Sequence, residues 1–450
     1  MYVKNRKFLI LGVSKSGIAA AKYLLSRNAD CFYYEEMSGE KIAAAKRELN
    51  LLGGKEATAE NIAAVLAETD VVIISPGVPI NHQVAVRAKS LGKRIIGEFE
   101  LGYESFTPTF IGVTGTNGKT TTVSLIDAIL KEAGESSKLV GNIGVPLTSE
   151  LAGDTGDTGD TVFVAEVSSF QLESVSEFHP YISCILNISP DHLERHYNME
   201  NYIFLKKRIF ANQRESDYCV LNYDDETVRS FYPDVKAKVV WISCEEEVDG
   251  AYLKGSALYF KGEKITEAIN IPLVGEHNIY NALFAAAVSK LLGADTAAVA
   301  KAISNFKGVP YRTQLVAEIN GVKFVNDSKS TNTASAMTAI AAAKVPTVLI
   351  LGGSEKGETY DKLFECIKNS AVKHVVLTGA SRRNMLSAAD KALYNDVTVC
   401  ADFDYAVRIA AMMANSGEQV LLSPACASFD AFSNFEERGE RFNKIAGERR

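Results

Sequence analysis

The sequence has no apolar run that approaches the roughly 18–20 residues a membrane-spanning helix needs. The apolar stretch at residues 8–13 is also too short for the core of a secretory signal, and we predict a strand there. The seven cysteines are scattered, odd in number and never in C-x-x-C spacing. That usage is typical of free thiols in a reducing compartment and excludes a disulfide framework or a C-x-x-C zinc site. We therefore expect a cytoplasmic protein.

There is no excess of basic residues either. Lysine and arginine number 48 against 55 aspartates and glutamates, for a net charge of −7, which argues against a dedicated nucleic-acid binder. The hydrophobic content of 47% and charged content of 23% exclude a disordered chain, a collagen and a coiled-coil rod. Because domains cluster near about 100–150 residues, a chain of 450 residues predicts about three of them.

Short apolar runs alternate with helical periodicity along the whole chain, without an internal sequence repeat or a low-complexity tail. This alternation predicts parallel strands joined by crossover helices. In the first hundred residues we predict strands at 7–13, 30–35, 71–75 and 94–96, a helix at 16–28 and a linker at 97–108. A second series has strands at 110–114, 161–167 and 181–188 and a helix at 120–133. A third series follows a boundary near 306–310, with strands at 347–351, 374–378 and 420–423.

The strongest local motif is VTGTNGKTTT at residues 113–122, between a predicted strand and a predicted helix. Backbone N–H groups of such a loop can surround a phosphate at the positive end of the helix. Lys119 would neutralise phosphate charge, and Thr120 or Thr121 could reach a magnesium ion. The motif departs from G-x-x-x-x-G-K-[ST] because Val113 replaces the first glycine. A tight turn with a solvated lysine is the alternative, and the strand–loop–helix context favours nucleotide phosphate.

Polar residues also follow the next two predicted strands. Glu166 ends the run VFVAE, and His192 follows Pro-Asp after the next strand. Ligands collect at the carboxyl ends of parallel strands, and a carboxylate there is costly unless it is paired or on a metal. We expect Glu166 near a metal, with a salt-bridged glutamate as the alternative. His192 could contact a metal or a phosphate, although a lone histidine is usually structural.

The N-terminal segment GVSKSG at residues 12–17 follows a strand and opens a helix. It lacks the middle glycine of G-x-G-x-x-G, so it supports an anionic ligand but not an NAD site. Glu35 or Glu36 could meet a ribose or base, and a plain turn explains these residues almost as well. No G-x-S-x-G elbow occurs, so Ser-His-Asp hydrolysis is not supported.

Several motifs follow one another in an order that resembles the Mur ligase family, the ATP-dependent amide-forming enzymes of peptidoglycan precursor synthesis. They are GTNGKT at 115–120, GNIG at 141–144, EVSSFQLE at 166–173, DH at 191–192, and HN at 277–278 with Asn281. Two later segments, NDSKSTN at 326–332 and SPACASFDAFSNFEERG at 423–439, resemble the members that add D-glutamate to UDP-N-acetylmuramoyl-L-alanine. The resemblance covers essentially the whole chain.

The resemblance implies an α/β protein with three domains in series. A Rossmann-like domain at 1–97 would hold the UDP end of the substrate, a P-loop-type ATPase domain at 98–309 would bind ATP, and a Rossmann-like domain at 310–450 would bind D-glutamate. It also implies an acyl-phosphate intermediate, which forms when the substrate carboxylate attacks ATP and is then attacked by the D-glutamate amine. We expect a cytoplasmic monomer that binds no nucleic acid and does not insert into a membrane.

The resemblance further implies site residues. ATP contacts would come from Gly115, Thr116, Asn117, Gly118, Lys119, Thr120, Thr121, Asn278, Asn281, Arg312 and Asp327. Substrate contacts would come from Lys15, Ser16, Glu35, Asn142, Lys329, Thr331, Lys356, Ser428 and Phe435. Two Mg²⁺ ions are implied, one near Thr120 and Glu166, the other near His192 and a carbamylated lysine. Lys119, Glu166, His192 and Lys206 would be the catalytic group.

Alignment with the family pattern selects Lys206 as the carbamylated lysine, with Lys207 as the alternative. A carbamate would convert a cation that repels Mg²⁺ into an anionic oxygen ligand, the type that Mg²⁺ prefers. From the residues alone, Lys206 would be a surface charge.

The rival functions come from two classes. Within the family they are the L-alanine-adding enzyme and folylpolyglutamate synthase, which residues 423–439 argue against. Outside it they are a P-loop NTPase switch, a Rossmann redox protein and a non-enzymatic scaffold. A scaffold would leave the phosphate loop, Glu166 and His192 unexplained.

Overall fold

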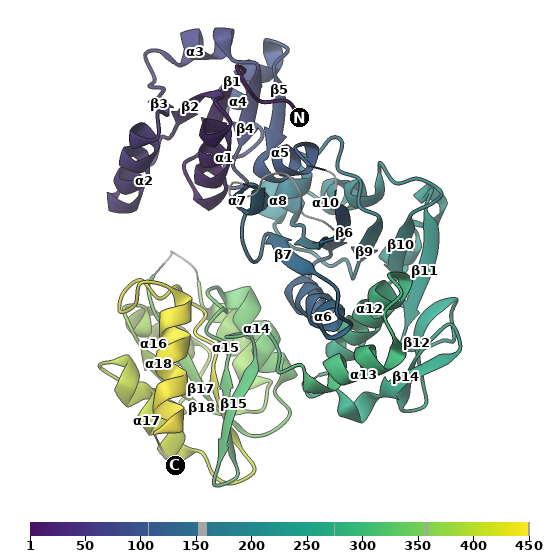
Figure 1. Cartoon of the computed structure of the whole chain (residues 1–450). Coiled ribbons are helices and arrows are strands. Elements are labelled where there is room, and N and C mark those ends of the chain that lie inside the picture. The colour runs from purple at the N-terminus through teal and green to yellow at the C-terminus, as the bar shows by residue number, and fades with distance from the viewer. Residues whose placement is uncertain (107, 152–159, 274, 356–358, 449–450) are drawn as a thin grey trace. The chain divides into compact units, whose positions relative to one another are not determined.

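The computed structural model describes residues 1–106, 108–151, 160–273, 275–355 and 359–448. It is an α/β protein with three sheets in series (Figure 1). The chain divides into two compact units, residues 1–271 with 276–306, and residues 272–275 with 307–450. The first unit contains two of the sheets and the second unit contains the third.

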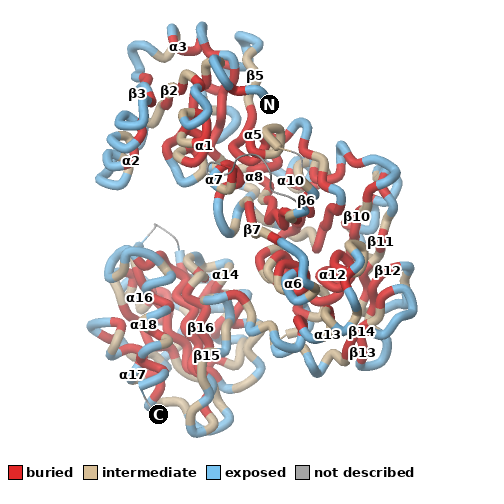
Figure 2. The backbone as a smooth tube through the Cα atoms, viewed as in Figure 1, coloured by how far each residue is buried: buried red, intermediate tan, exposed pale blue. Residues whose placement is uncertain are grey.

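The N-terminal sheet has the strand order β3-β2-β1-β4-β5 and is parallel throughout. Its strands are β1 (Lys7–Leu11), β2 (Asp30–Tyr34), β3 (Lys55–Glu56), β4 (Val71–Ile74) and β5 (Arg94–Gly97). Its helices are α1 (Lys15–Ser26), α2 (Glu40–Leu51), α3 (Ile62–Glu68), α4 (Gln83–Ser90) and α5 (Glu98–Glu104). Alternate residues of β1 and β4 enter two separate hydrophobic clusters, so the sheet is buried on both faces (Figure 2). That double burial is the doubly wound arrangement.

The central sheet has nine strands in the order β14-β13-β12-β11-β10-β9-β6-β8-β7, with β12–β13 and β13–β14 antiparallel and the other pairs parallel. Its strands are β6 (Thr109–Thr114), β7 (Ser137–Gly141), β8 (Val162–Glu166), β9 (Ile182–Ile185), β10 (Tyr218–Asn222), β11 (Lys238–Ser243), β12 (Gly250–Lys254), β13 (Ala257–Phe260) and β14 (Glu263–Glu267). Its helices are α6 (Lys119–Glu132), α7 (Leu147–Leu151), α8 (Ser169–Leu172), α9 (Leu193–His196), α10 (Met199–Lys207), α11 (Glu226–Arg229), α12 (His277–Leu291) and α13 (Thr296–Asn305). Short 3₁₀ turns occupy Arg208–Phe210, Tyr232–Asp234 and Ala268–Asn270.

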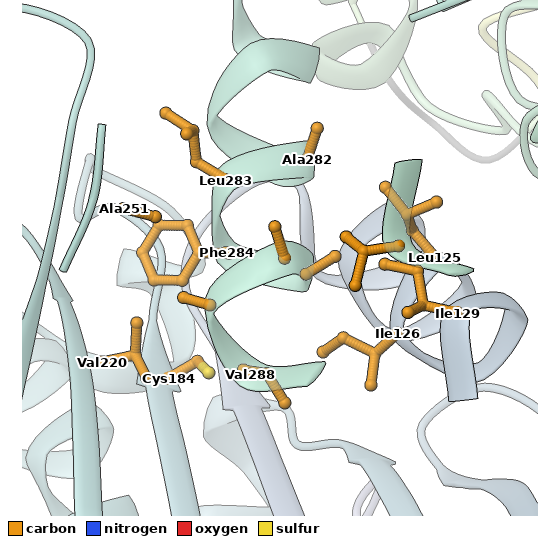
Figure 3. Packing of buried hydrophobic residues seen from close by; sticks show 14 of the residues in the cluster. Leu125, Ile126, Ile129, Cys184, Val220, Ala251, Ala282, Leu283, Phe284 and Val288 are labelled. Atoms are coloured by element: carbon orange, nitrogen blue, oxygen red, sulfur yellow. The ribbon is translucent and has the colours of Figure 1, made fainter. Parts of the chain in front are cut away.

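Helices α6 and α12 cover one face of the central sheet (Figure 3). Ile126 and Ile129 of α6 lie near α12, while Phe284 and Val288 of α12 point toward strand residues that include Cys184. Burial at roughly 25 cal/mol per Å² of apolar surface makes such a cluster the main stabilising contribution in this part of the molecule. The packing fixes the start of α6, and so the loop before it, relative to α12.

The third sheet has the order β15-β16-β20-β17-β18-β19 and is parallel except for β15–β16. Its strands are β15 (Gln314–Ile319), β16 (Val322–Asn326), β17 (Thr347–Gly352), β18 (Val372–Thr378), β19 (Val397–Val399) and β20 (Gln419–Leu422). Its helices are α14 (Thr333–Ala342), α15 (Asp361–Lys368), α16 (Arg382–Lys391), α17 (Phe403–Met413) and α18 (Phe435–Gly447). Alternate residues of β17 and β18 again enter two clusters, one on each face.

The predicted strands correspond to β1, β2, β4, β5, β6, β8, β9, β17, β18 and β20, with ends that differ by a few residues, and the predicted helices at 16–28 and 120–133 correspond to α1 and α6. The remaining strands, β3, β7, β10–β16 and β19, were not predicted. The predicted linker at 97–108 is wrong for most of its length, because Glu98–Glu104 is helix α5. Its Phe99 and Leu101 are buried at 2% and 0% exposure, since they enter the cores of two different sheets. All seven cysteines lie in the described part and are free thiols. Among the described helices, none combines the length and apolar character needed to cross a membrane.

Candidate active site

The loop between β6 and α6 has the geometry of a phosphate cradle. Gly118 is left-handed at φ 83°, and a Cβ there would lie 2.5 Å from the side-chain oxygen of Asn281, so only glycine fits without a shift. The Nζ atom of Lys119 folds back onto the loop and donates to the carbonyl oxygens of Gly115 (2.8 Å) and Thr116 (2.7 Å). The amine therefore lies over the loop, at the positive end of α6.

The predicted metal-binding pair is in direct contact. Thr120, at the start of α6, donates its hydroxyl to Oε2 of Glu166 at 2.7 Å. The amide of Asn142 donates to the other carboxylate oxygen at 2.7 Å. Both Thr120 and Glu166 are buried, at 4% and 3% exposure. A hydroxyl and a carboxylate beside a phosphate cradle fit Mg²⁺, which takes oxygen ligands and completes its shell with substrate phosphates and water.

Lys206 lies beneath the same loop, which its sequence context did not suggest. It is 1% exposed, and its Nζ atom is 2.9 Å from the carbonyl oxygen of Gly115 and 3.1 Å from the hydroxyl of Thr114. Burial, reinforced by the nearby charge of Lys119, lowers the pKa of Lys206 well below its usual range. A larger fraction of this amine is therefore neutral than of an ordinary lysine. Lys207 instead pairs with Asp234.

The turn before α9 presents His192 in a half-exposed position. His192 is left-handed at φ 51°, and its two ring nitrogens lie 3.5 Å from carboxylate oxygens of Asp191 and Glu194. Its ring packs on Phe170 with centroids 4.9 Å apart. The half-exposed imidazole of His192 therefore lies among carboxylates. No cluster of three or more His, Cys, Asp or Glu side chains suited to a metal occurs in the described part of the chain.

The two asparagines predicted near adenine are buried on α12. Asn281 donates to the side-chain oxygen of Asn278 at 2.9 Å and accepts from the hydroxyl of Thr122 at 3.2 Å. Asn281 is also the residue that crowds Gly118. The structure thus places these asparagines beside the phosphate loop, 160 residues away in the sequence.

The N-terminal residues predicted to bind the UDP end occupy the carboxyl edge of the first sheet. Glu35 accepts backbone hydrogen bonds from Val13 (2.7 Å) and Met37 (2.8 Å), so its carboxylate already orders the loop after β1. Lys15, the first residue of α1, donates to the carbonyl oxygen of Gly144 at 2.9 Å. Ser16 follows it in the first turn of α1.

In the second unit, Asp327, Lys329 and Thr331 follow β16, and Ser428 follows β20. Arg312 precedes β15, and its backbone N–H donates to the carbonyl oxygen of Val309. Asp327 is 2% exposed and accepts from the hydroxyl of Ser423 (2.7 Å) and the backbone N–H of Thr313 (3.0 Å). Burial raises the pKa of Asp327, opposed by these hydrogen bonds and by the charge of Arg312. Lys329 donates its backbone N–H to Tyr311, and Thr331 donates its own to Lys329.

Ser428 is buried at 2% exposure, and its carbonyl oxygen accepts from the backbone of Ala431 and Phe432. Phe435 opens α18, and its carbonyl oxygen accepts from Ser328 at 2.8 Å. Lys356 lies outside the described residues.

Arg438 and Tyr202 were not singled out from the sequence. Arg438 is 2% exposed, and its guanidinium donates to the hydroxyl and carbonyl of Ser328 and to the carbonyls of Cys426 and Ala427. It therefore ties together the two loops that carry the predicted D-glutamate residues. Burial lowers its pKa to about 10. Helical spacing in the sequence could have identified Arg438 as buried, because it lies on the apolar face of α18 with Phe442 and Ile445.

Tyr202 contacts the phosphate loop directly. Its hydroxyl lies 3.1 Å from the hydroxyl of Thr116, and the residue is 1% exposed. Its ring faces Nζ of Lys206 at 5.2 Å. Tyr202 and Lys206 are one helical turn apart on α10, a spacing that predicts a shared face but not what that face contacts.

Comparison with known proteins gives consistent matches. Residues 113–289 match the Mur ligase middle domain, and residues 311–426 match the Mur ligase glutamate ligase domain. The chain is 40% identical to the UDP-N-acetylmuramoylalanine–D-glutamate ligase of Caldanaerobacter subterraneus, over 99% of this chain and 98% of that protein. It is 39% identical to the enzyme of that name from Clostridioides difficile, over 98% of both chains.

Solved structures resemble the fold at lower identity. UDP-N-acetylmuramate–alanine ligase of Thermotoga maritima superposes with a TM-score of 0.61 at 20% identity, over 99% of this chain and 100% of that one. MurF of Acinetobacter baumannii gives a TM-score of 0.59 at 16% identity, over 97% and 93%. These two likenesses concern the three-domain fold alone.

Proposed function

The chain belongs to the Mur ligase family, and we propose that it is an ATP-dependent ligase that joins D-glutamate to UDP-N-acetylmuramoyl-L-alanine in peptidoglycan precursor synthesis. The observation that carries the proposal is the full-length match to relatives that bear this activity in their names. Residues 1–97 would hold the UDP end, 98–309 would bind ATP and 310–450 would bind D-glutamate. Without the relatives, the site geometry would support ATP chemistry but would not specify the substrates.

The first chemical step is phosphoryl transfer to the substrate carboxylate. The γ-phosphate of ATP passes to the L-alanyl carboxylate, which gives an acyl phosphate and ADP. The phosphate loop holds the phosphates through its backbone N–H groups, and Lys119 leaves the carbonyls of Gly115 and Thr116 to offset developing charge. Asn278 and Asn281 are proposed to contact the adenine end, and their burial on α12 beside the phosphate loop supports that role. Arg312 and Asp327 are proposed as the contribution of the third domain to ATP.

Thr120 and Glu166 would hold Mg²⁺, which would supply positive charge to offset that of the phosphates. The amide of Asn142 keeps the carboxylate oriented from its other oxygen.

A second Mg²⁺ would bind near His192 and a carbamylated Lys206. Carbamylation requires a neutral amine: Lys-NH₂ attacks CO₂, a C–N bond forms and one proton is released. The environment of Lys206 supports this step, because burial beside Lys119 disfavours the ammonium form. Carbon-13 NMR in ¹³C-bicarbonate tests it. A carbamate resonance present in the wild type and absent in Lys206→Gln is expected, and an unchanged spectrum would contradict it.

In the second step, the D-glutamate amine attacks the acyl phosphate, an amide forms and phosphate leaves. Lys329, Thr331, Ser428 and Phe435 are proposed to surround the two carboxylates of D-glutamate, with Lys356 as a further contact. Lysines, hydroxyls and backbone N–H groups are the donors that a dianionic amino acid needs. Arg438 does not belong to this set but holds the loop before Ser428, because its guanidinium donates to the carbonyl oxygens of Cys426 and Ala427.

The test is phosphate release from ATP and Mg²⁺ with UDP-N-acetylmuramoyl-L-alanine, in the presence of D-glutamate, L-glutamate or neither. Release only with D-glutamate, together with a product heavier by one glutamyl unit, is the expected result. Release without any acceptor would indicate an NTPase instead. Turnover with L-alanine and UDP-N-acetylmuramate would indicate a different ligase of the family.

A further inference from the structure

Helix α5 is buried between two hydrophobic cores. Phe99 packs edge-on against Phe178, with ring centroids 4.8 Å apart, in the core of the central sheet. Leu101 belongs to the core of the N-terminal sheet. A Cβ on Gly102 would lie 2.6 Å from Leu147 of α7, so α5 and α7 approach as closely as a glycine allows. Helix α5 therefore packs against both the N-terminal sheet and the central sheet and links their positions.

The same helix carries a carboxylate with a specific partner on α7. Oε1 of Glu98 accepts two hydrogen bonds from Thr148, from the backbone N–H at 2.6 Å and from the hydroxyl at 2.7 Å. Glu98 is 3% exposed, and burial raises its pKa to about 7, opposed by Thr148 and by the charge of Lys15. Burying a carboxylate costs more free energy than burying an apolar side chain of similar size. The two hydrogen bonds to Thr148 offset part of that cost, and they are what Glu98 adds to the structure.

Thr148 lies in the first turn of α7, directly after the loop that carries Asn142. The loop is tight, since Gly141 and Gly144 have φ of 95° and 76°, and a Cβ on Gly141 would lie 2.4 Å from the carbonyl oxygen of Glu166. Asn142 bonds to Glu166 twice, through its backbone N–H (2.9 Å) and through its amide (2.7 Å). The loop is thus attached to the metal-binding carboxylate at one end.

The other attachments of this loop come from N-terminal elements. Lys15 of α1 holds the carbonyl oxygen of Gly144 at 2.9 Å, and Glu98 of α5 holds Thr148. Residues 141–148 therefore connect the domain that would hold the UDP end to Glu166, where the substrate carboxylate would react.

We propose that Glu98 is a positioning residue: by anchoring Thr148 it sets the loop at 141–148, and through Asn142 it sets Glu166 and the reacting end of the UDP-linked substrate. The role of the loop in turnover rests on the proposed function, whereas the anchoring itself does not. Glu98 touches no reacting atom and acts only through Thr148. Lys15 holds the same loop at Gly144, whereas Glu98 holds it at Thr148, so the two residues anchor different points of the loop.

The experiment compares Glu98→Ala, Glu98→Gln and Thr148→Val with the wild type. Hydrogen exchange of the peptide that covers residues 141–149 measures anchoring, and steady-state kinetics measure its consequence. Glu98→Ala should speed exchange in this peptide and lower kcat/KM for the UDP-linked substrate at least about tenfold, because small misplacements are costly near the reacting atoms. KM for D-glutamate, which is proposed to bind the third domain, should stay within about twofold.

Glu98→Gln retains an acceptor oxygen and should restore both readouts to near the wild-type values. Thr148→Val, which is less disruptive, should speed exchange at 141–149 and serves if Glu98→Ala does not fold. The matched control is Asp127→Asn. Asp127 is a buried carboxylate on α6 that accepts a 2.7 Å hydrogen bond from Ser137, at the opposite end of β7 from Gly141. This variant should leave the exchange of residues 141–149 unchanged.

Unchanged exchange at 141–149 in both Glu98→Ala and Thr148→Val would overturn the proposal. Faster exchange with unchanged kinetics would overturn the link to Asn142. A wild type without ligase activity would remove the proposed function alone, because the exchange readout is independent of turnover.

Discussion

The amine of Lys206 lies 2.9 Å from the carbonyl oxygen of Gly115, on the inner side of the loop that would cradle the phosphates of ATP. A lysine buried there, beside Lys119, is costly as an ammonium ion. A carbamate at that position would replace repulsion by attraction toward Mg²⁺. The contact with Gly115 places Lys206 at the candidate active site, although the sequence alone would suggest a surface charge.

Lys206→Ala should lower ligase activity at least about 100-fold, because it removes a charged group from a preorganised site. Lys207→Ala is the matched control, since Lys207 is the next residue and pairs with Asp234 away from the loop. Measuring phosphate release in both variants checks the assignment. Equal losses in the two would contradict the choice of Lys206.

Glu166→Gln should raise the Mg²⁺ concentration needed for half-maximal activity by at least about tenfold. The amide keeps the shape of the side chain but removes the negative charge that Mg²⁺ prefers. A magnesium titration of ATP-dependent turnover measures the effect, with the exposed Glu226→Gln as control. An unaltered magnesium requirement would remove Glu166 from the metal site.

Arg438→Leu should destabilise the second unit by about 3 kcal/mol, because the carbonyls of Cys426, Ala427 and Ser328 would lose a buried donor. Urea unfolding followed by circular dichroism measures the loss. Arg441→Ala provides the contrast, since its ion pair with Asp404 is exposed and should contribute much less. KM for D-glutamate should rise in Arg438→Leu, as the Ser428 loop loses its support.

The pKa of Glu98 gives a pH dependence of stability with a definite sign. Its pKa rises from about 4.5 to about 7 on folding, so between these values the folded state holds a proton that the unfolded state has released. Stability from this group is therefore present at low pH and falls as pH rises toward 7.

Glu98→Gln lacks this titration. Its free energy of unfolding, relative to wild type, should rise by about 2.5 kcal/mol between pH 5 and pH 8. Urea unfolding of both proteins at the two pH values tests this. Parallel pH profiles would show that Glu98 does not titrate in this range.

Local patterns in the sequence were enough to predict the three α/β series, the phosphate loop and the polar strand ends. Each depends on residues close together in the chain: apolar runs for buried strands, glycines and Lys119 between a strand and a helix, Glu166 at a strand end. The D-glutamate-adding function came from family motifs, because stereochemistry and acceptor choice cannot be read from periodicity.

Other features depend on contacts between distant residues. The segment at 97–108 looked like a linker because its apolar residues have no periodic neighbours of their own, yet Phe99 and Leu101 enter two cores and Glu98 meets Thr148. Arg438 is one of several charged residues in the sequence of α18, and its partners lie on loops up to 110 residues away.

The amino-acid sequence was enough to indicate three α/β series, the loop at 113–122 and the strand-end position of Glu166, since these follow from local backbone preference and hydrophobic periodicity. Three features emerge only when the chain is folded: Lys206 is buried under Gly115, Asn281 lies against Gly118, and α5 connects two cores. The physical reason is that burial and the pKa values it shifts are set by which distant side chains exclude water from a group, and local sequence does not specify those neighbours.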